Sequence, residues 1–239
     1  MANSDAPTTR QDLIRAYNLL VGGISDEAES DDDRAYGGII RAAKGKLVES
    51  MATHIIRLAW QESGGRPDRL SLQDRRRYKV PIQRDYIKLL PSELRKHIKS
   101  NKDEYFFDAQ VDVHVYLDKR FVMGVECKAY AENAMLKRIL VDFRLLKSLH
   151  PDLICCLLQL ENMLGGGYSQ PLASPQYGSP RSHVLMSHFP EVSLEVITLL
   201  EGHRQVKEPI HNPEYFKELR PEILDHAIGR FASLLEPFA

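Results

Sequence analysis

The sequence has little cysteine, and it lacks the motifs that several common classes of site require. Only three cysteines occur in 239 residues, Cys127, Cys155 and Cys156, and none forms a C-x-x-C pair. The nine histidines show no HExxH, zinc-finger or HNH-like spacing. The sequence therefore argues against a disulfide framework and against structural zinc. It also contains no serine nucleophile elbow and no dinucleotide fingerprint. Residues 38–47 fail the P-loop spacing and lack its Ser/Thr.

Long apolar runs and targeting signals are absent as well. No stretch approaches 18 apolar residues, and the amino terminus has no basic segment followed by an apolar one. A hydrophobic content of 43% and a charged content of 27% are ordinary for a globular protein. We therefore expect a soluble, cytoplasmic protein with no membrane partner, and a chain long enough for one domain with a sizeable core.

The sequence also has almost no net charge, since its formal charge at pH 7 is −1. This charge is unevenly distributed along the chain. Residues 26–33 carry six acids, whereas residues 64–102 carry twelve Lys and Arg against four acids. Such asymmetry matters more than the total when the partner is a polyanion, although a basic run can also be simply a solvated face.

Residues 111–128 show the clearest pattern in the chain. Apolar residues alternate with other types on both sides of a turn at residues 118–120, which predicts two half-buried antiparallel strands. A three-residue turn places Leu117 opposite Phe121, Val115 opposite Met123, Val113 opposite Val125 and Val111 opposite Cys127. One face of this hairpin is then wholly apolar, and a slip by one residue is costly where a face is buried.

The other face of the predicted hairpin carries two acids and an amine. Asp112 lies opposite Glu126 with Cβ atoms about 5 Å apart, and Lys128 follows on the same side. Two carboxylates this close repel by roughly 3 kcal/mol at an effective dielectric of 20. A divalent cation between them removes this repulsion, and Mg²⁺ prefers hard oxygen ligands. Lys128 can then orient a water or stabilise charge on a phosphate, so the pattern is that of a metal-dependent phosphodiester hydrolysis site.

These residues resemble a known motif. Asp112, thirteen intervening residues and then Glu126-Cys127-Lys128 are similar to the Asp…(Asp/Glu)-X-Lys signature of the PD-(D/E)XK nucleases, and most similar to type II restriction endonucleases. Val111 stands where these nucleases often have proline. The resemblance covers roughly residues 36–165. It implies a restriction-endonuclease-like α/β core, with a mixed β-sheet flanked by helices.

Helical and strand periodicity predicts the elements around the hairpin. A short helix is expected at residues 9–20, a polar loop at 22–33, a helix at 38–62, a helix from residue 91 to about 99 and a strand at 104–107. A helix at 133–149 followed by an apolar strand at 153–160 predicts a parallel crossover, with Cys155 and Cys156 in the core. A long polar loop at 165–190, a strand at 195–200 and a helix at 213–235 complete the chain.

Further site residues follow from the resemblance and from the distribution of charge. In many nucleases of this kind the first helix sends a glutamate towards the metal, and Glu49 is the candidate; its alternative is a surface salt bridge. His114 shares the catalytic face as a bystander, a core residue or a proton shuttle. DNA contacts are expected from the basic segment and from the long polar loop, through Arg75, Arg76, Arg77, Lys79, Arg84, Arg181 and His183.

The sequence therefore predicts one nuclease domain over residues 1–239. Within it, residues 36–165 form the catalytic core, 64–102 the DNA-contacting segment, and 165–239 the recognition loop and C-terminal helix. The resemblance implies a Mg²⁺-dependent type II restriction endonuclease that acts as a homodimer on double-stranded DNA, with a cognate DNA methyltransferase as genetic partner. The alternatives are a repair or recombination nuclease, and a non-catalytic DNA-binding protein in which Glu126 and Lys128 form a surface ion pair.

Overall fold

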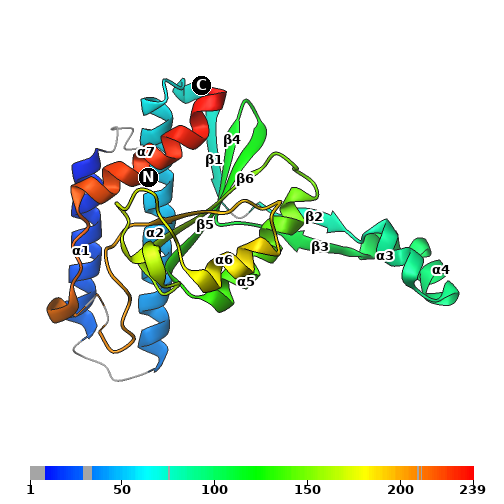
Figure 1. Cartoon of the computed structure of the whole chain (residues 1–239), viewed down its shortest axis with the longest axis horizontal. Coiled ribbons are helices and arrows are strands. Elements are labelled where there is room, and N and C mark those ends of the chain that lie inside the picture. The colour runs from blue at the N-terminus through cyan, green and yellow to red at the C-terminus, as the bar shows by residue number, and fades with distance from the viewer. Residues whose placement is uncertain (1–8, 29–33, 75, 209, 211) are drawn as a thin grey trace.

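A five-stranded mixed sheet lies between two groups of helices (Figure 1). The computed structural model describes residues 9–28, 34–74, 76–208, 210 and 212–239. The strand order is β1-β4-β5-β6-β7, and the strands are β1 (Leu70–Asp74), β4 (Val113–Leu117), β5 (Arg120–Ala131), β6 (Ile154–Asn162) and β7 (Glu195–Thr198). The main helices are α1 (Arg10–Ala28), α2 (Arg34–Glu62), α5 (Asn133–Lys147), α6 (Pro180–Ser187) and α7 (Pro221–Leu235).

The pairing within this sheet confirms the predicted mixed topology. β1, β4 and β5 are antiparallel neighbours, whereas β5, β6 and β7 are parallel. Helix α5 connects β5 to β6, as the sequence predicts for a parallel crossover. β6 is buried along nearly its whole length, because helices cover both faces of the sheet.

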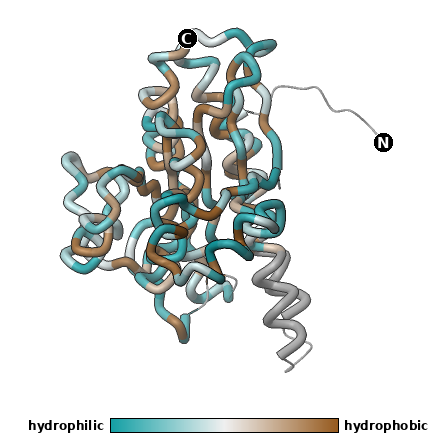
Figure 2. Tube along the Cα trace, turned by 90° about the vertical axis from the view of Figure 1, so that its right-hand side faces the viewer, coloured by the Kyte–Doolittle hydropathy of each residue, from teal (hydrophilic) through white to brown (hydrophobic). Residues whose placement is uncertain are grey.

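Each face of the sheet has its own apolar core. On one face, Val113, Val115 and Val125 pack with the buried side chains of α1, α2 and α7. On the other face, Tyr116 and Phe121 pack with the buried side of α5. Figure 2 shows hydrophobic segments running through the middle of the molecule, where these strands lie. The expectation of a half-buried hairpin was therefore wrong, because α5 covers the second face and every residue of β4 is buried.

The register of the hairpin is partly as predicted. Val113 pairs with Val125 and Val115 with Met123, which confirms the alternation of the two strands. The turn, however, contains two residues, Asp118 and Lys119, both with positive φ (48° and 68°). A two-residue turn with positive φ at both residues matches the right-handed twist of the flanking strands, whereas a type I or II turn would splay them. An irregularity after Val115 then restores the predicted register further from the turn.

This two-residue turn changes the pairs beside it. Leu117 lies opposite Arg120 and not opposite Phe121, which pairs with Tyr116. β4 begins only at Val113, so the predicted pair of Val111 and Cys127 lies outside the ladder.

A second, two-stranded sheet carries an arm that projects from the body (Figure 1). The arm comprises residues 78–109: β2 (Tyr78–Pro81), α3 (Arg84–Leu89), α4 (Ser92–Ser100) and β3 (Phe106–Ala109). α4 confirms the helix predicted from residue 91. The strand predicted at 104–107 is shifted to β3, which pairs with β2 and not with the hairpin. No element predicted from the sequence corresponds to β1, β2 or α3.

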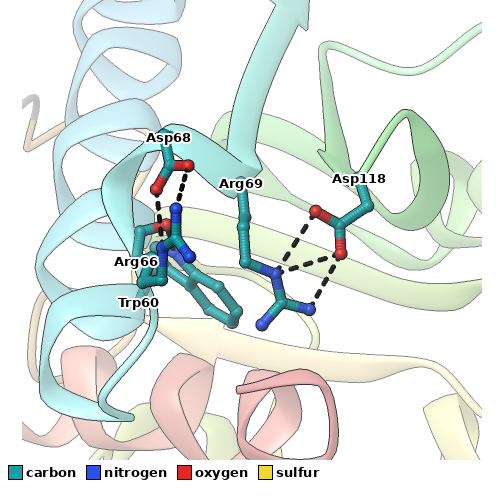
Figure 3. Close-up of polar contacts among 5 residues, drawn as sticks. All are labelled: Trp60, Arg66, Asp68, Arg69 and Asp118. Carbon is teal, nitrogen blue, oxygen red and sulfur yellow. Dashed lines mark hydrogen bonds and ion pairs between the residues drawn. The ribbon is translucent and has the colours of Figure 1, made fainter.

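The end of α2 is attached to the hairpin turn through Trp60 (Figure 3). The Trp60 ring is fully buried and its Nε1 donates to the Arg66 carbonyl oxygen at 2.7 Å. Arg69 lies over this ring, with its Cζ 5.6 Å from the centroid, and its guanidinium donates to both carboxylate oxygens of Asp118. Gly65 leaves room for the ring, since a Cβ there would lie 2.0 Å from Trp60. These contacts fix α2 against β1 and the hairpin.

The larger differences from the predicted boundaries lie in three segments. α1 continues to Ala28, so the expected loop at 22–33 is helical over its first part, and residues 29–33 lie outside the described residues. The expected loop at 165–190 contains a 3-10 turn (Gly166–Ser169) and helix α6, which Ser179 caps by accepting from the Ser182 amide. The last helix begins at Pro221, because a separate 3-10 turn occupies Pro213–Tyr215. Among the helices of the described chain, none is long and apolar enough to cross a membrane.

Candidate active site

The hairpin brings the three predicted catalytic side chains together. Asp112 directly precedes β4, and Glu126 and Lys128 lie on the same side of β5. Lys128 Nζ lies 2.7 Å from Glu126 Oε1 and 3.2 Å from Asp112 Oδ2. The backbone holds the aspartate in place, since the Cys127 amide donates to Asp112 Oδ2 at 2.7 Å. The predicted meeting of two acids and an amine is therefore present in the fold.

Burial and mutual charge shape the ionisation of this cluster. Burial, and then the neighbouring carboxylate of Asp112, raise the pKa of Glu126. Burial alone would lower the pKa of Lys128, but the carboxylates of Glu126 and Asp112 outweigh it and raise that pKa. Lys128 is therefore charged at neutral pH and offsets the repulsion between the two acids. An ammonium held in this way is a permanent donor to a nearby phosphate.

The oxygen atoms around Lys128 fit a hard divalent cation. Besides the two carboxylates, the Cys127 carbonyl oxygen accepts from Lys128 Nζ at 3.1 Å. Three oxygens thus lie around the Lys128 ammonium. Carboxylate and carbonyl oxygens are also the ligands that Mg²⁺ prefers. In the part of the chain that the structure describes, no group of three or more His, Cys, Asp or Glu side chains is arranged to hold a metal. Any ion here would therefore need the carbonyl, water or substrate oxygens as well.

Two cavities meet at Asp112. One, of about 350 Å³, is lined by Asp112, Glu126 and Lys128 together with residues of α5 and of the segment before β4. The other, of about 410 Å³, lies between α2 and β1, and Asp112 and Glu49 both line it. Glu49 therefore faces the site from its second side, but it does not join Asp112 and Glu126 in one ligand group. Its predicted role as a metal ligand stays a prediction.

His114 is a core residue. Its ring is fully buried opposite Gly124, and it lies 5.0 Å from the ring of Phe121 and 5.8 Å from that of Tyr78. Burial lowers the pKa of His114 to about 4. Of the three readings of this residue, the structure supports the core histidine, since a buried imidazole of this kind stays neutral at physiological pH.

The predicted DNA-binding residues fall into two groups in space. Arg76, Arg77 and Lys79 lie exposed at the base of the arm, and Arg84 starts α3; Arg75 lies outside the described residues. Arg76 rests against Tyr78 and Tyr116, with its Cζ 5.4 and 5.2 Å from the two ring centroids.

Not all of the basic segment is available to a partner. Arg66 pairs with Asp68, and Arg69 pairs with Asp118 at the hairpin turn. Part of the local excess of positive charge at residues 64–102 is therefore engaged within the fold.

The second group lies on α6. Arg181 is exposed and lines a hollow of about 480 Å³ between α5 and α6, with Lys137 on the other side. His183 is exposed as well, but its Nε2 lies 2.7 Å from the Tyr177 carbonyl oxygen, which holds the ring near the backbone. These two residues lie on a helix and not on a loop, and the structure does not bring them into the cavities beside Asp112.

Sequence reasoning missed two residues of the α5 cavity. Arg138 and Asp142 both line it, and they form a loose ion pair at 3.6 Å. Burial raises the pKa of Asp142. The sequence did contain a signal, because Met135, Arg138, Ile139 and Asp142 follow the helical spacing of a single stripe, and all four line the cavity.

A known protein shows a close similarity over almost the whole chain. No protein-family model matches the sequence. The sequence is 47% identical over 222 residues to the type II restriction enzyme DdeI of Desulfomicrobium norvegicum, an alignment that covers 91% of this chain and 92% of that protein. It therefore extends well beyond residues 36–165, where the motif resemblance ended.

Proposed function

The chain belongs to the type II restriction enzymes, and from this premise we propose that it hydrolyses phosphodiester bonds of one short duplex sequence with Mg²⁺ as cofactor. As a member of this family it is a site-specific deoxyribonuclease, and its substrate is DNA. The observation that carries the finer proposal is the convergence of Asp112, Glu126 and Lys128 beside two cavities.

The proposed cofactor fits the oxygen donors of the site. Asp112, Glu126 and the Cys127 carbonyl would hold the ion, because their oxygens lie close together, all within hydrogen-bond distance of Lys128 Nζ. Bound Mg²⁺ supplies a Lewis acid that neutralises charge on the scissile phosphate. Glu49, in the adjoining cavity, is proposed to complete a second metal position.

Lys128 supplies a fixed positive charge and N–H donors in the proposed reaction. Its raised pKa keeps the ammonium charged, so its N–H groups orient the attacking water and stabilise the pentavalent phosphate. The rigid setting of β5, which is paired on both sides by β4 and β6, holds the ammonium in place. Arg76, Arg77, Lys79 and Arg84 are proposed to contact DNA from the arm and its base, and Arg181 and His183 from α6.

The assembly and genetic context are part of the same proposal. Cutting both strands of a two-fold symmetric site requires two active sites, so we propose a homodimer. A cognate DNA methyltransferase is the expected genetic partner. We also retain one nuclease domain over residues 1–239, with the core, basic and C-terminal segments at the boundaries predicted from the sequence.

Incubation of plasmid DNA with the purified protein tests the proposal. With Mg²⁺ we expect discrete fragments whose sequenced ends share one motif, and with EDTA we expect intact plasmid. Cleavage confined to branched or damaged DNA would support a repair nuclease. Intact plasmid together with a retained gel shift would instead support a DNA-binding protein without catalysis.

A further inference from the structure

One face of α2 carries two cations and two hydroxyls beside the proposed site, although the Thr53 hydroxyl already donates to the Glu49 carbonyl oxygen at 3.0 Å. Lys46, Ser50, Thr53 and Arg57 follow each other at spacings of four, three and four residues, so they lie on one side of the helix. All four line the 410 Å³ cavity that also contains Glu49 and Asp112. We call these four residues the α2 stripe. Neither the motif nor the basic segment at residues 64–102 includes them.

The charge of this cavity is arranged by position. Lys46 and Arg57 are exposed at the two ends of the stripe, and neither forms an ion pair with another side chain in the described ranges. The acids of the cavity, Glu49, Asp74 and Asp112, come from α2, β1 and the start of β4. Glu49 lies between Lys46 and Arg57 in the sequence of α2. The two ends of the stripe are therefore basic, and an acid lies between them. The three acids outnumber the two cations, so an anionic chain would contact the ends of the stripe, while the acids lie towards the proposed metal site.

The length of the stripe suits a nucleic acid strand. Eleven residues of α-helix separate Lys46 from Arg57, which corresponds to about 16 Å along the axis. Duplex DNA carries one phosphate per strand for about every 3.4 Å of its axis, so a duplex lying parallel to α2 would present roughly five phosphates of one strand over this length. Lys, Arg and Ser are among the side chains that donate to phosphate oxygens, so Lys46, Ser50 and Arg57 supply the donors of the stripe.

The two cavities also lie on either side of Asp112. We propose that the α2 stripe binds the sugar-phosphate backbone of the cleaved strand on one side of the scissile phosphate. The cavity beside α5 then receives the part of the same strand on the other side of that phosphate. This inference rests on the proposed nuclease function. It assigns to α2 a DNA-positioning surface in addition to those of the arm and α6.

Salt-dependent binding tests the inference. The stripe variant Lys46→Ala/Arg57→Ala and a control, Arg15→Ala/Lys207→Ala, each lose one Lys and one Arg and so carry the same net charge. Both control residues are exposed and line neither cavity. Affinity is measured by fluorescence anisotropy in Ca²⁺ without Mg²⁺, on a duplex that the wild-type protein cuts in Mg²⁺. The salt concentration is varied between about 50 and 200 mM.

We expect the stripe variant to bind roughly 10- to 100-fold more weakly, with a salt slope less steep by about 2, because two phosphate contacts are lost. The control should retain the wild-type slope, and the charge-preserving swap Lys46→Arg/Arg57→Lys should restore most of the affinity. Circular dichroism checks folding. If the alanine variant is unfolded, Lys46→Gln/Arg57→Gln takes its place with the same expected slope.

Several results would overturn the inference. An unchanged slope and affinity in the stripe variant, with normal wild-type binding, would remove the α2 stripe from the DNA surface and leave the proposed function intact. A shift to monomer in sedimentation at an unchanged salt slope would make the stripe a contact between two copies. If the wild-type protein neither cuts nor binds any duplex, the proposed function itself fails, and this inference fails with it.

Discussion

The body of the molecule and its arm use hydrophobic side chains in opposite ways. In the body, β4, β5 and β6 are buried between α2 and α5, and most of their side chains lie in one of the two cores. In the arm, few side chains are buried, and several large apolar residues are exposed: Tyr86, Leu89, Leu94, Phe106 and Phe107. The body therefore surrounds the candidate active site with packed side chains, whereas the arm leaves most of its side chains exposed.

This difference has a consequence for mutations. A substitution in the body should act mainly on the free energy of unfolding or on the chemical step. A substitution in the arm should act mainly on DNA affinity, because little packing is lost there.

The largest effect is expected at the amine of the body site. Lys128→Ala should lower the cleavage rate by about 10³-fold or more, because the attacking water and the charged phosphate lose their donor. Specific DNA binding, measured by gel shift in Ca²⁺, should remain. Unchanged turnover in this variant would remove Lys128 from the catalytic assignment, and the same would hold for Asp112→Asn or Glu126→Gln with normal rates.

Two leucine substitutions compare the regions directly. Leu140 is fully buried in α5 against the sheet, whereas Leu89 in the arm is 83% exposed. Leu140→Ala should lower the free energy of unfolding by about 2–5 kcal/mol, since it leaves a cavity. Leu89→Ala should change it by less than about 0.5 kcal/mol. Urea unfolding followed by circular dichroism measures both, and equal losses would contradict the division between body and arm.

His114 makes the stability of the body depend on pH. Its pKa is lowered to about 4 in the folded state, against about 6.5 when unfolded, so between these values the unfolded chain binds the extra proton. His114 therefore contributes stability that is fully present above pH 6.5 and is lost as the pH falls towards 4, by up to about 3 kcal/mol. His114→Phe should flatten the pH dependence of urea unfolding in this window. An unaltered slope would show that the imidazole is not neutral in the core.

The smallest effect is expected from single cations at the arm. Arg77→Ala and Arg84→Ala should each weaken DNA binding by roughly 3- to 10-fold and reduce the salt slope by about 1, because each loses one phosphate contact. Thermal unfolding should be unchanged, since both side chains are exposed. If either substitution lowers the melting temperature without altering the salt slope, that residue belongs to the packing of the protein.

Local patterns predicted much of the body. Alternation in residues 111–128 predicted the hairpin and the convergence of Asp112, Glu126 and Lys128, since the period of a strand decides which side chains share a face. The helix and apolar strand after Lys128 predicted the parallel crossover. The predicted length of the turn was wrong by one residue, because the conformation of Asp118 and Lys119 depends on strand twist and not on hydrophobic spacing.

The sequence by itself determined which side chains lie on one face of a strand or helix, because that depends on neighbours close in the chain. Only the tertiary structure decided which of these faces meet. It buried His114 beneath Tyr78 and Phe121, and it paired Arg69 with Asp118 across 49 residues. It also placed the α2 stripe beside Asp112. Such contacts join segments far apart in sequence, and their geometry follows from the packing of whole elements, which no local pattern encodes.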